Sequence, residues 1–234
     1  MPLTVLAIES ASLACSVVVA AGKTILCAER VDSRYGQAEA LLPIVDAAVR
    51  KAGLAPAALD LVAVSVGPGS FTGIRVGLAA ARGIALATGA RIVGVSNFEA
   101  VAATISASRR HAAQSLLVAL ESRREDIFVG LFDRALRPAG PPAGVMPAAL
   151  SKMVREKIGA APLLIAGDAG QRAALALADR EDINVLDSSA PDAAGVLLAG
   201  LSDPQGIDVG APRPLYLRPP DVTVACRRPT RPSG

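Results

Sequence analysis

The order of the apolar segments constrains the fold most, because one succession of strands and helices occurs twice along the chain. In the first half, three short segments of strand character precede helices that alternate with strands. The predicted strands are 3–9, 15–20, 23–31, 60–66 and 91–95, and the predicted helices are 37–52, 71–88 and 97–108. Helices that alternate with strands cover the faces of a mixed sheet. The pattern therefore predicts an α/β fold.

The second half repeats this order with shorter and less regular segments. Strands are predicted at 115–121, 125–133, 162–166 and 183–187, with a further strand before 147–158, and helices at 147–158, 170–180 and 191–201. We therefore expect two similar α/β lobes that face each other across a cleft, which is a natural place for a small-molecule site. The predicted boundaries are 1–108 for the first lobe, 109–217 for the second and 218–234 for a flexible Pro- and Arg-rich tail. Whether the helix at 191–201 packs on the first or the second lobe stays open.

The charge distribution argues against a nucleic-acid-binding body. The chain of 234 residues has 24 basic and 21 acidic side chains, and its net charge of +3 is carried by the segment from Arg218 onward. Residues 1–217 are electrically neutral overall, so they have no surplus of positive charge to hold a polyanion. Aromatic residues make up 3% of the chain and Trp is absent, which also argues against a stacking platform for single strands.

Histidine and cysteine are too few for several kinds of site. His111 is the single histidine, so paired histidines cannot hold a metal, and no GxSxG nucleophile motif is present. Cys15, Cys27 and Cys226 form no CxxC pair, which predicts neither a disulfide framework nor a zinc cluster. The start of the chain lacks the features of a signal peptide, and no apolar stretch is long enough to span a membrane. We expect a cytoplasmic protein with no catalytic and no metal site.

The stretch Gly67–Gly73 (GPGSFTG) lies between a predicted strand and a predicted helix. Free N–H groups at a helix start can bind a phosphate, but the sequence continues as Ile74-Arg75 and lacks the lysine of a Walker motif. A tight turn in which Ser70 caps the helix is the alternative.

Two helices have features suited to close packing. In 71–88, small residues recur every four positions, at Gly73, Gly77, Ala81 and Ala85, so that another element can approach the backbone. The helix 37–52 has an apolar face, although Pro43 lies inside the helix. Either face could pack within the fold or against a partner. If a partner covers it, Gly77→Leu is expected to disrupt assembly more than folding.

The segment Glu9-Ser10-Ala11-Ser12 follows the first predicted strand. An acid with two hydroxyls at a strand end could serve a phosphate group or a hydrated Mg²⁺ ion. Ordinary turn and cap chemistry explains the same residues.

Several ordered motifs resemble the TsaB (YeaZ) family of tRNA threonylcarbamoyladenosine biosynthesis subunits. The most specific is VGPGSFTGIRVGLAAARGIA at 66–85, and the others are LAIESASLACSVVV at 6–19, LLPIVDAAV at 41–49, IVGVSNFEA at 92–100, ALESRREDIFVGLF at 119–132 and PLYLR at 214–218. The resemblance covers residues 3–218. It implies a two-lobed fold of the actin/Hsp70/sugar-kinase (ASKHA) type, with a mixed sheet and flanking helices in each lobe.

The resemblance also implies a role. TsaB-type chains resemble non-catalytic paralogues of TsaD, which transfers threonylcarbamoyl to adenosine 37 of ANN-decoding tRNAs. The resemblance implies that the chain docks on TsaD through its first two helices and that a TsaE-type ATPase is a third subunit. It also implies that the chain alone is a homodimer and that tRNA is contacted only through the complex. No cofactor is expected, apart from a nucleotide at a subunit interface. The implied interface residues are Leu41, Leu42, Val45, Val49, Phe71, Ile74, Gly77 and Ala81.

The chain departs from the family pattern at Glu9, Gln37 and Glu121, where relatives usually have Asp, His and Asp. Glu9, Ser10 and Ser12 are therefore interpreted as a vestigial phosphate loop. The alternative is an enzyme in its own right, namely a nucleotide-dependent kinase or ATPase of the same fold, or a peptidase.

Overall fold

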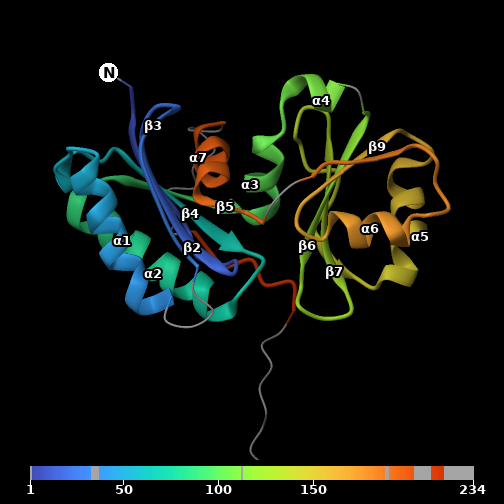
Figure 1. The fold of residues 1–234 in the computed structure, drawn as a ribbon, viewed down its shortest axis with the longest axis horizontal. Coiled ribbons are helices and arrows are strands. Elements are labelled where there is room, and N and C mark those ends of the chain that lie inside the picture. Colours follow the sequence, from blue (N-terminus) through green and yellow to red (C-terminus); the bar gives the residue numbers. More distant parts are fainter. Residues whose placement is uncertain (1, 33–36, 112, 188–189, 203–211, 219–234) are drawn as a thin grey trace, which may run out of the picture.

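The computed structural model describes residues 2–32, 37–111, 113–187, 190–202 and 212–218. They form two five-stranded sheets that lie side by side, each with helices on its faces (Figure 1). The predicted tail from 219 onward, including Cys226, and residues 203–211 fall outside the described residues. No helix within the described ranges combines the length and the apolarity needed to cross a membrane.

The first sheet has the strand order β3-β2-β1-β4-β5. Its strands are β1 (Thr4–Glu9), β2 (Ala14–Ala21), β3 (Thr24–Asp32), β4 (Leu61–Gly67) and β5 (Arg91–Ser96). β1, β2 and β3 form an antiparallel meander, and β4 and β5 continue the sheet parallel to β1. The two-residue turn between β2 and β3 includes Gly22 at a φ of 56°, a conformation that glycine adopts without steric strain.

Helices cover both faces of this sheet because its strands alternate apolar side chains between the faces. α1 (Gln37–Lys51) and α2 (Phe71–Thr88) pack on the face that carries Leu6 and Ile8. α3 (Asn97–Thr104) and α7 (Ala193–Ser202) pack on the opposite face, which carries Val5 and Ala7. The predicted helix at 191–201 thus lies on the first lobe, next to α3 (Figure 1).

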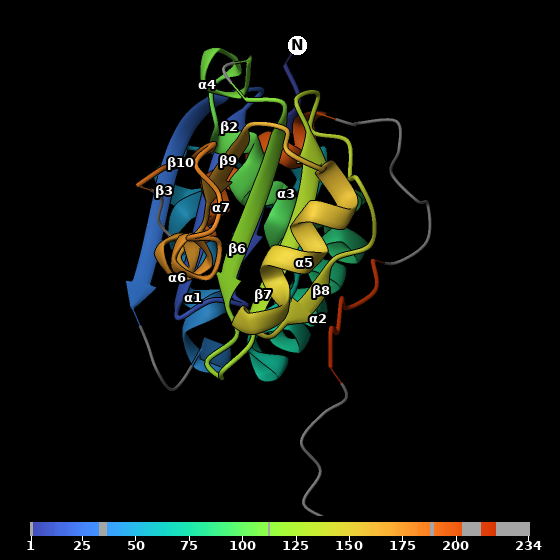
Figure 2. The same cartoon turned by 90° about the vertical axis from the view of Figure 1, so that its right-hand side faces the viewer.

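The second sheet repeats the topology with the order β10-β9-β6-β7-β8. Its strands are β6 (Ser115–Glu121), β7 (Ile127–Asp133), β8 (Ala143–Val145), β9 (Leu163–Ala166) and β10 (Ile183–Val185). α5 (Pro147–Ile158) and α6 (Gly170–Ala176) cover its outer face (Figure 2). The inner face packs against α3, where the Phe98 ring fills the space beside Gly130. α3 therefore belongs to the cores of both lobes.

The predicted fold class, two α/β lobes with mixed sheets, is confirmed. Two helix ends were predicted wrongly. The helix expected over 97–108 ends at Thr104, because Ile105 adopts extended backbone, and α4 (Ala107–His111) follows as a separate turn. The helix expected over 170–180 ends at Ala176. The further strand expected before 147–158 is present as β8. A 3₁₀ turn, η1 (Pro56–Ala58), precedes β4.

Candidate functional site

The residues proposed for partner binding lie mostly on the inner faces of α1 and α2. Six of the eight are buried against the first sheet of this same chain, namely Leu41, Val45, Val49, Ile74, Gly77 and Ala81. They cannot present a surface to another molecule while the lobe is folded. The assignment of these six to a partner interface is therefore corrected: they form the core between α1, α2 and the sheet.

The stripe of small residues on α2 has a partner within the chain. A Cβ added at Gly77 would overlap the Ser10 Oγ and meet the Val64 side chain. The Ser10 hydroxyl donates to the carbonyl oxygen of Gly73 at 2.9 Å, so the end of β1 approaches the helix backbone directly. The stripe thus permits close approach of the chain's own β1.

The other two predicted residues are accessible. Leu42 is 55% exposed on the outer side of α1. Phe71 is partly buried in the first turn of α2, where Tyr216 packs on its ring with centroids 5.1 Å apart and the Arg75 guanidinium lies over it at 3.7 Å. Phe71 is thus partly covered by a segment from the far end of the chain.

The outer face of α2 shows features that the sequence analysis did not single out. Leu86 is 88% exposed, more than any other large apolar side chain in the described part of the chain. Ala79 and Gly83 are also exposed, and a Cβ added at Gly83 would meet nothing within 4 Å. Exposed apolar side chains are common singly, but here small and apolar residues lie close together on a helix side that also carries Arg75 and Arg82. Together with Leu42 and Pro43 of α1, we call these residues the outer helix face: Leu42, Pro43, Ala79, Gly83 and Leu86.

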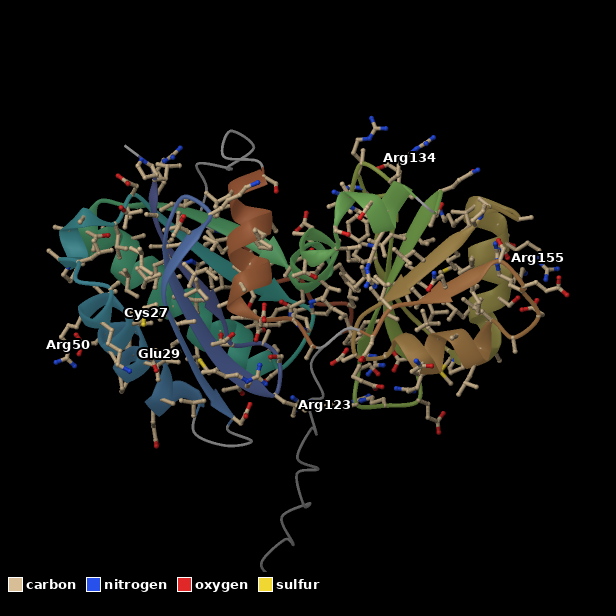
Figure 3. The ribbon with its side chains drawn as sticks, turned by 45° about the horizontal axis from the view of Figure 1, so that its top comes forward. Cys27, Glu29, Arg50, Arg123, Arg134 and Arg155 are labelled. Atoms are coloured by element: carbon tan, nitrogen blue, oxygen red, sulfur yellow. The ribbon has the colours of Figure 1, made fainter. Side chains whose placement is uncertain are left out.

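α1 is anchored at its C-terminal end, so its outer side has a fixed position on the lobe. Lys51 Nζ contacts a carboxylate oxygen of Glu29 on β3 at 2.6 Å. The Cys27 thiol also lies against Glu29, on the side of the lobe seen in Figure 3.

The predicted vestigial phosphate loop is a buried turn. The Glu9 carboxylate accepts bonds from the backbone N–H groups of Ala11 (2.8 Å) and Ser12 (3.0 Å) and from the Ser12 hydroxyl (2.5 Å). Glu9 and Ser10 are fully buried. Burial raises the pKa of Glu9 to about 7, although its hydrogen bonds act in the opposite direction. The oxygens of Glu9 are thus used within the turn and the hydroxyl of Ser10 is bonded to α2, which fits the turn and cap alternative that the sequence left open.

The GPGS turn packs tightly on that segment. The Ser70 N–H donates to the carbonyl oxygen of Ala11 at 2.7 Å, and a Cβ at Gly69 would overlap the same carbonyl. Ser70 caps α2 by accepting from the Gly73 N–H at 3.2 Å, as predicted. Asn97 donates to the carbonyl oxygen of Pro68 at 3.0 Å, while its own Oδ1 is buried without a partner.

A cavity of about 430 Å³ lies between the lobes. Its walls come from the turns after β1 and β4, the turn after β6 and the segment 215–218. Arg123 lies at this opening, on the turn that joins β6 to β7 (Figure 3). Glu121 at the end of β6 is held in an ion pair with Arg172. Among the described residues, no group of three or more His, Cys, Asp or Glu side chains is arranged to hold a metal ion.

Comparison with known proteins identifies the family. An uncharacterized protein of Mycobacterium tuberculosis, Rv3421c, is 33% identical over 224 residues, which are 94% of this chain and 93% of that protein. The TsaB of Haemophilus influenzae, a tRNA threonylcarbamoyladenosine biosynthesis protein, is 32% identical over 130 residues, or 54% and 52% of the two chains. The YeaZ structure from Pseudomonas aeruginosa superposes with a TM-score of 0.74 at 26% identity, covering 92% of this chain and all of that one. The chain belongs to the TsaB (YeaZ) family.

A second match shows that part of this TsaB-family chain is similar to an enzyme family. Residues 34–137 match the family model of TsaD, described as tRNA N6-adenosine threonylcarbamoyltransferase. This range includes both α1 and α2. The two helices whose outer side is exposed therefore lie in the region that the chain shares with the TsaD family.

The sequence offered little signal for the outer helix face. Leu86 stands outside the apolar stripe of its helix, and one apolar residue on a polar side is usual. In the sequence, Gly83 is a glycine inside a predicted helix, and nothing nearby indicates why a larger residue would not fit there.

Proposed function

We propose that this chain is a non-catalytic subunit in the formation of N6-threonylcarbamoyladenosine at position 37 of tRNA, and that it docks on a TsaD-type catalytic enzyme. Support for the pathway comes from relatives named as biosynthesis proteins of this modified nucleoside. Support for the partner comes from the TsaD-family match over residues 34–137.

The observation that carries the docking proposal is the exposure of Leu42 and Leu86 on the two helices that this match includes. Burying a leucine side chain contributes roughly 1.5–3 kcal/mol, so two such residues are effective anchors for an interface. On the exposed side of α2, Ala79 and Gly83 precede Leu86 and leave room for a partner helix to approach closely. The matching helices of a TsaD-type enzyme are the proposed occupants.

The remaining partners follow from this assignment. A TsaE-type ATPase joins the complex as a third subunit, and tRNA is contacted through the complex. In the absence of its partner, the chain forms a homodimer through the same outer helix face, because an exposed apolar patch associates with a complementary one.

Reconstitution tests the proposal. Purified TsaD-type and TsaE-type proteins from the same cell are supplied with tRNA and with the threonylcarbamoyl donor, in the presence and absence of this chain. We expect modified adenosine only when the chain is present, and co-elution of the chain with the TsaD-type enzyme. Equal modification without the chain contradicts the proposal.

One observation favours a second candidate, an independent nucleotide-dependent enzyme, because the cavity between the lobes has the volume of a ligand site. Steady ATP hydrolysis by the chain alone, at about 1 s⁻¹ or faster as is usual for enzymes, would support this candidate. Loss of that activity on substitution of a cavity residue would exclude a contaminant.

A further inference from the structure

The segment Pro212–Arg218, which contains the PLYLR motif, crosses from one lobe to the other (Figure 1). We propose that this segment is an interlobe strap that fixes the angle between the lobes and closes one wall of the cleft. The proposal does not depend on the proposed function, since it concerns the motion of this chain alone.

The first half of the strap is bound to the first lobe. The N–H of Leu215 donates to the carbonyl oxygen of Val66 on β4 at 2.8 Å. Arg82 of α2 donates to the carbonyl oxygen of Pro212 at 2.7 Å. Gly94 on β5 leaves space for the Pro212 ring, since an added Cβ there would collide with it. Hydrogen bonds to β4 and α2 and a packing contact with β5 thus hold the strap on this lobe.

The aromatic residue in the middle of the strap contacts the start of α2. The Tyr216 ring packs on Phe71, and the Tyr216 hydroxyl accepts a bond from Arg75 Nε at 3.2 Å. Arg75 in turn lies over the Phe71 ring. These three side chains form one cluster, so a movement of the strap would disturb the first turn of the helix.

The last residues of the strap contact the second lobe. Arg218 forms an ion pair with Asp126, which is buried at the start of β7, and its guanidinium lies 5.2 Å from the centroid of the Phe128 ring. Leu215 and Leu217 pack on the apolar cluster that contains Phe98 and Phe128. Loss of these contacts would expose apolar surface at the cleft and leave the Asp126 carboxylate without its ion-pair partner.

The position of the strap determines its mechanical effect. The lobes are also joined through α3 and the link that follows it, where a hinge would bend, and through the connection from β10 to α7, because α7 packs on the first lobe. The strap lines the cavity between the lobes, away from the link after α3. A pair of lobes attached at separate places cannot open by a simple hinge motion unless one attachment is released. We therefore infer that the cleft keeps a fixed width in the intact chain.

Spin-label distance measurements test the strap. Labels are placed at Ile25→Cys on β3 and Leu175→Cys on α6, both exposed and outside the outer helix face, after Cys15→Ala, Cys27→Ser and Cys226→Ser. The intact strap is expected to give one narrow distance distribution. The double variant Arg218→Gln/Leu217→Ser is expected to broaden it and shift it to longer distances.

The control is Arg155→Gln, which breaks an ion pair with Asp179 inside the second lobe and is expected to leave the distribution unchanged (Figure 3). If the double variant does not fold, Asp126→Asn removes the same ion pair with the strap sequence intact, and a smaller broadening is expected. A distribution in the folded strap variant that equals the one in the intact chain overturns the proposal. So does a broad distribution in the intact chain.

Discussion

The inner and outer faces of α2 have similar small-residue spacing but different surroundings. On the inner face, Gly77 and Ala81 allow β1 and its turn to approach the helix backbone. On the outer face, Ala79 and Gly83 lie at the same spacing, and a Cβ added at Gly83 would meet nothing. The comparison teaches that such spacing indicates close approach by some element, whereas only the fold reveals which one.

The largest expected effect of a substitution is on the inner face. Gly77→Leu places a large side chain where Ser10 and Val64 already lie, so overpacking should lower the free energy of unfolding by about 3 kcal/mol or more. Urea denaturation measures this value. Near-native stability combined with loss of partner binding would mean that the inner face, and not the outer one, is the interface.

The next largest effect is expected from the buried carboxyl group of Glu9, which makes the stability of the chain depend on pH. Burial raises the pKa of Glu9 from 4.5 to about 7, so the folded chain binds this proton more tightly than the unfolded chain. The stability contributed by protonated Glu9 is complete below about pH 4.5 and declines as the pH rises to about 7.

Glu9→Gln removes this titration while keeping a side-chain oxygen for the turn. Relative to the variant, the wild type is expected to lose roughly 2–3 kcal/mol of unfolding free energy between about pH 5 and pH 8. Denaturant titrations at several pH values measure the difference, with the exposed Glu181→Gln as control. Parallel pH profiles for wild type and Glu9→Gln would show that the carboxyl does not titrate in this range.

The smallest effect is expected on the outer face. Gly83→Ala adds a methyl group in open space and removes a helix-weakening glycine, so it should raise the free energy of unfolding by about 0.5–1 kcal/mol. Thermal unfolding of the purified variant measures the gain, at a protein concentration low enough to keep the chain monomeric. A loss of stability would indicate that something already covers this position in the isolated chain.

Much of the fold was predictable from local patterns. The strand meander, the cap at Ser70 and the repeated order of elements all follow from alternation, capping chemistry and turn residues close together in the chain. The end of α3 was missed because the apolar pattern continues past Thr104, whereas the backbone becomes extended at Ile105. The bounds of β8 could not be predicted, because three residues between prolines carry no alternation.

The candidate site was less predictable, because an apolar stripe has the same periodicity whether it faces a sheet or a partner. Leu41 and Ile74 matched an amphipathic face and lie in the core. Leu86 did not match that face, and it lies on the exposed side. The strap joins residues such as Arg75 and Tyr216, whose separation along the chain gives no local signal.

The central claim is that the outer helix face binds the TsaD-type enzyme, and titration calorimetry of two matched variants tests it. Leu86→Glu and Leu175→Glu each place a charge at a strongly exposed leucine, the first on α2 and the second on α6 of the other lobe. We predict that Leu86→Glu weakens binding at least tenfold, or about 1.4 kcal/mol, while Leu175→Glu binds like the wild type, and that both fold normally. Equal affinity of Leu86→Glu and the wild type would contradict the claim.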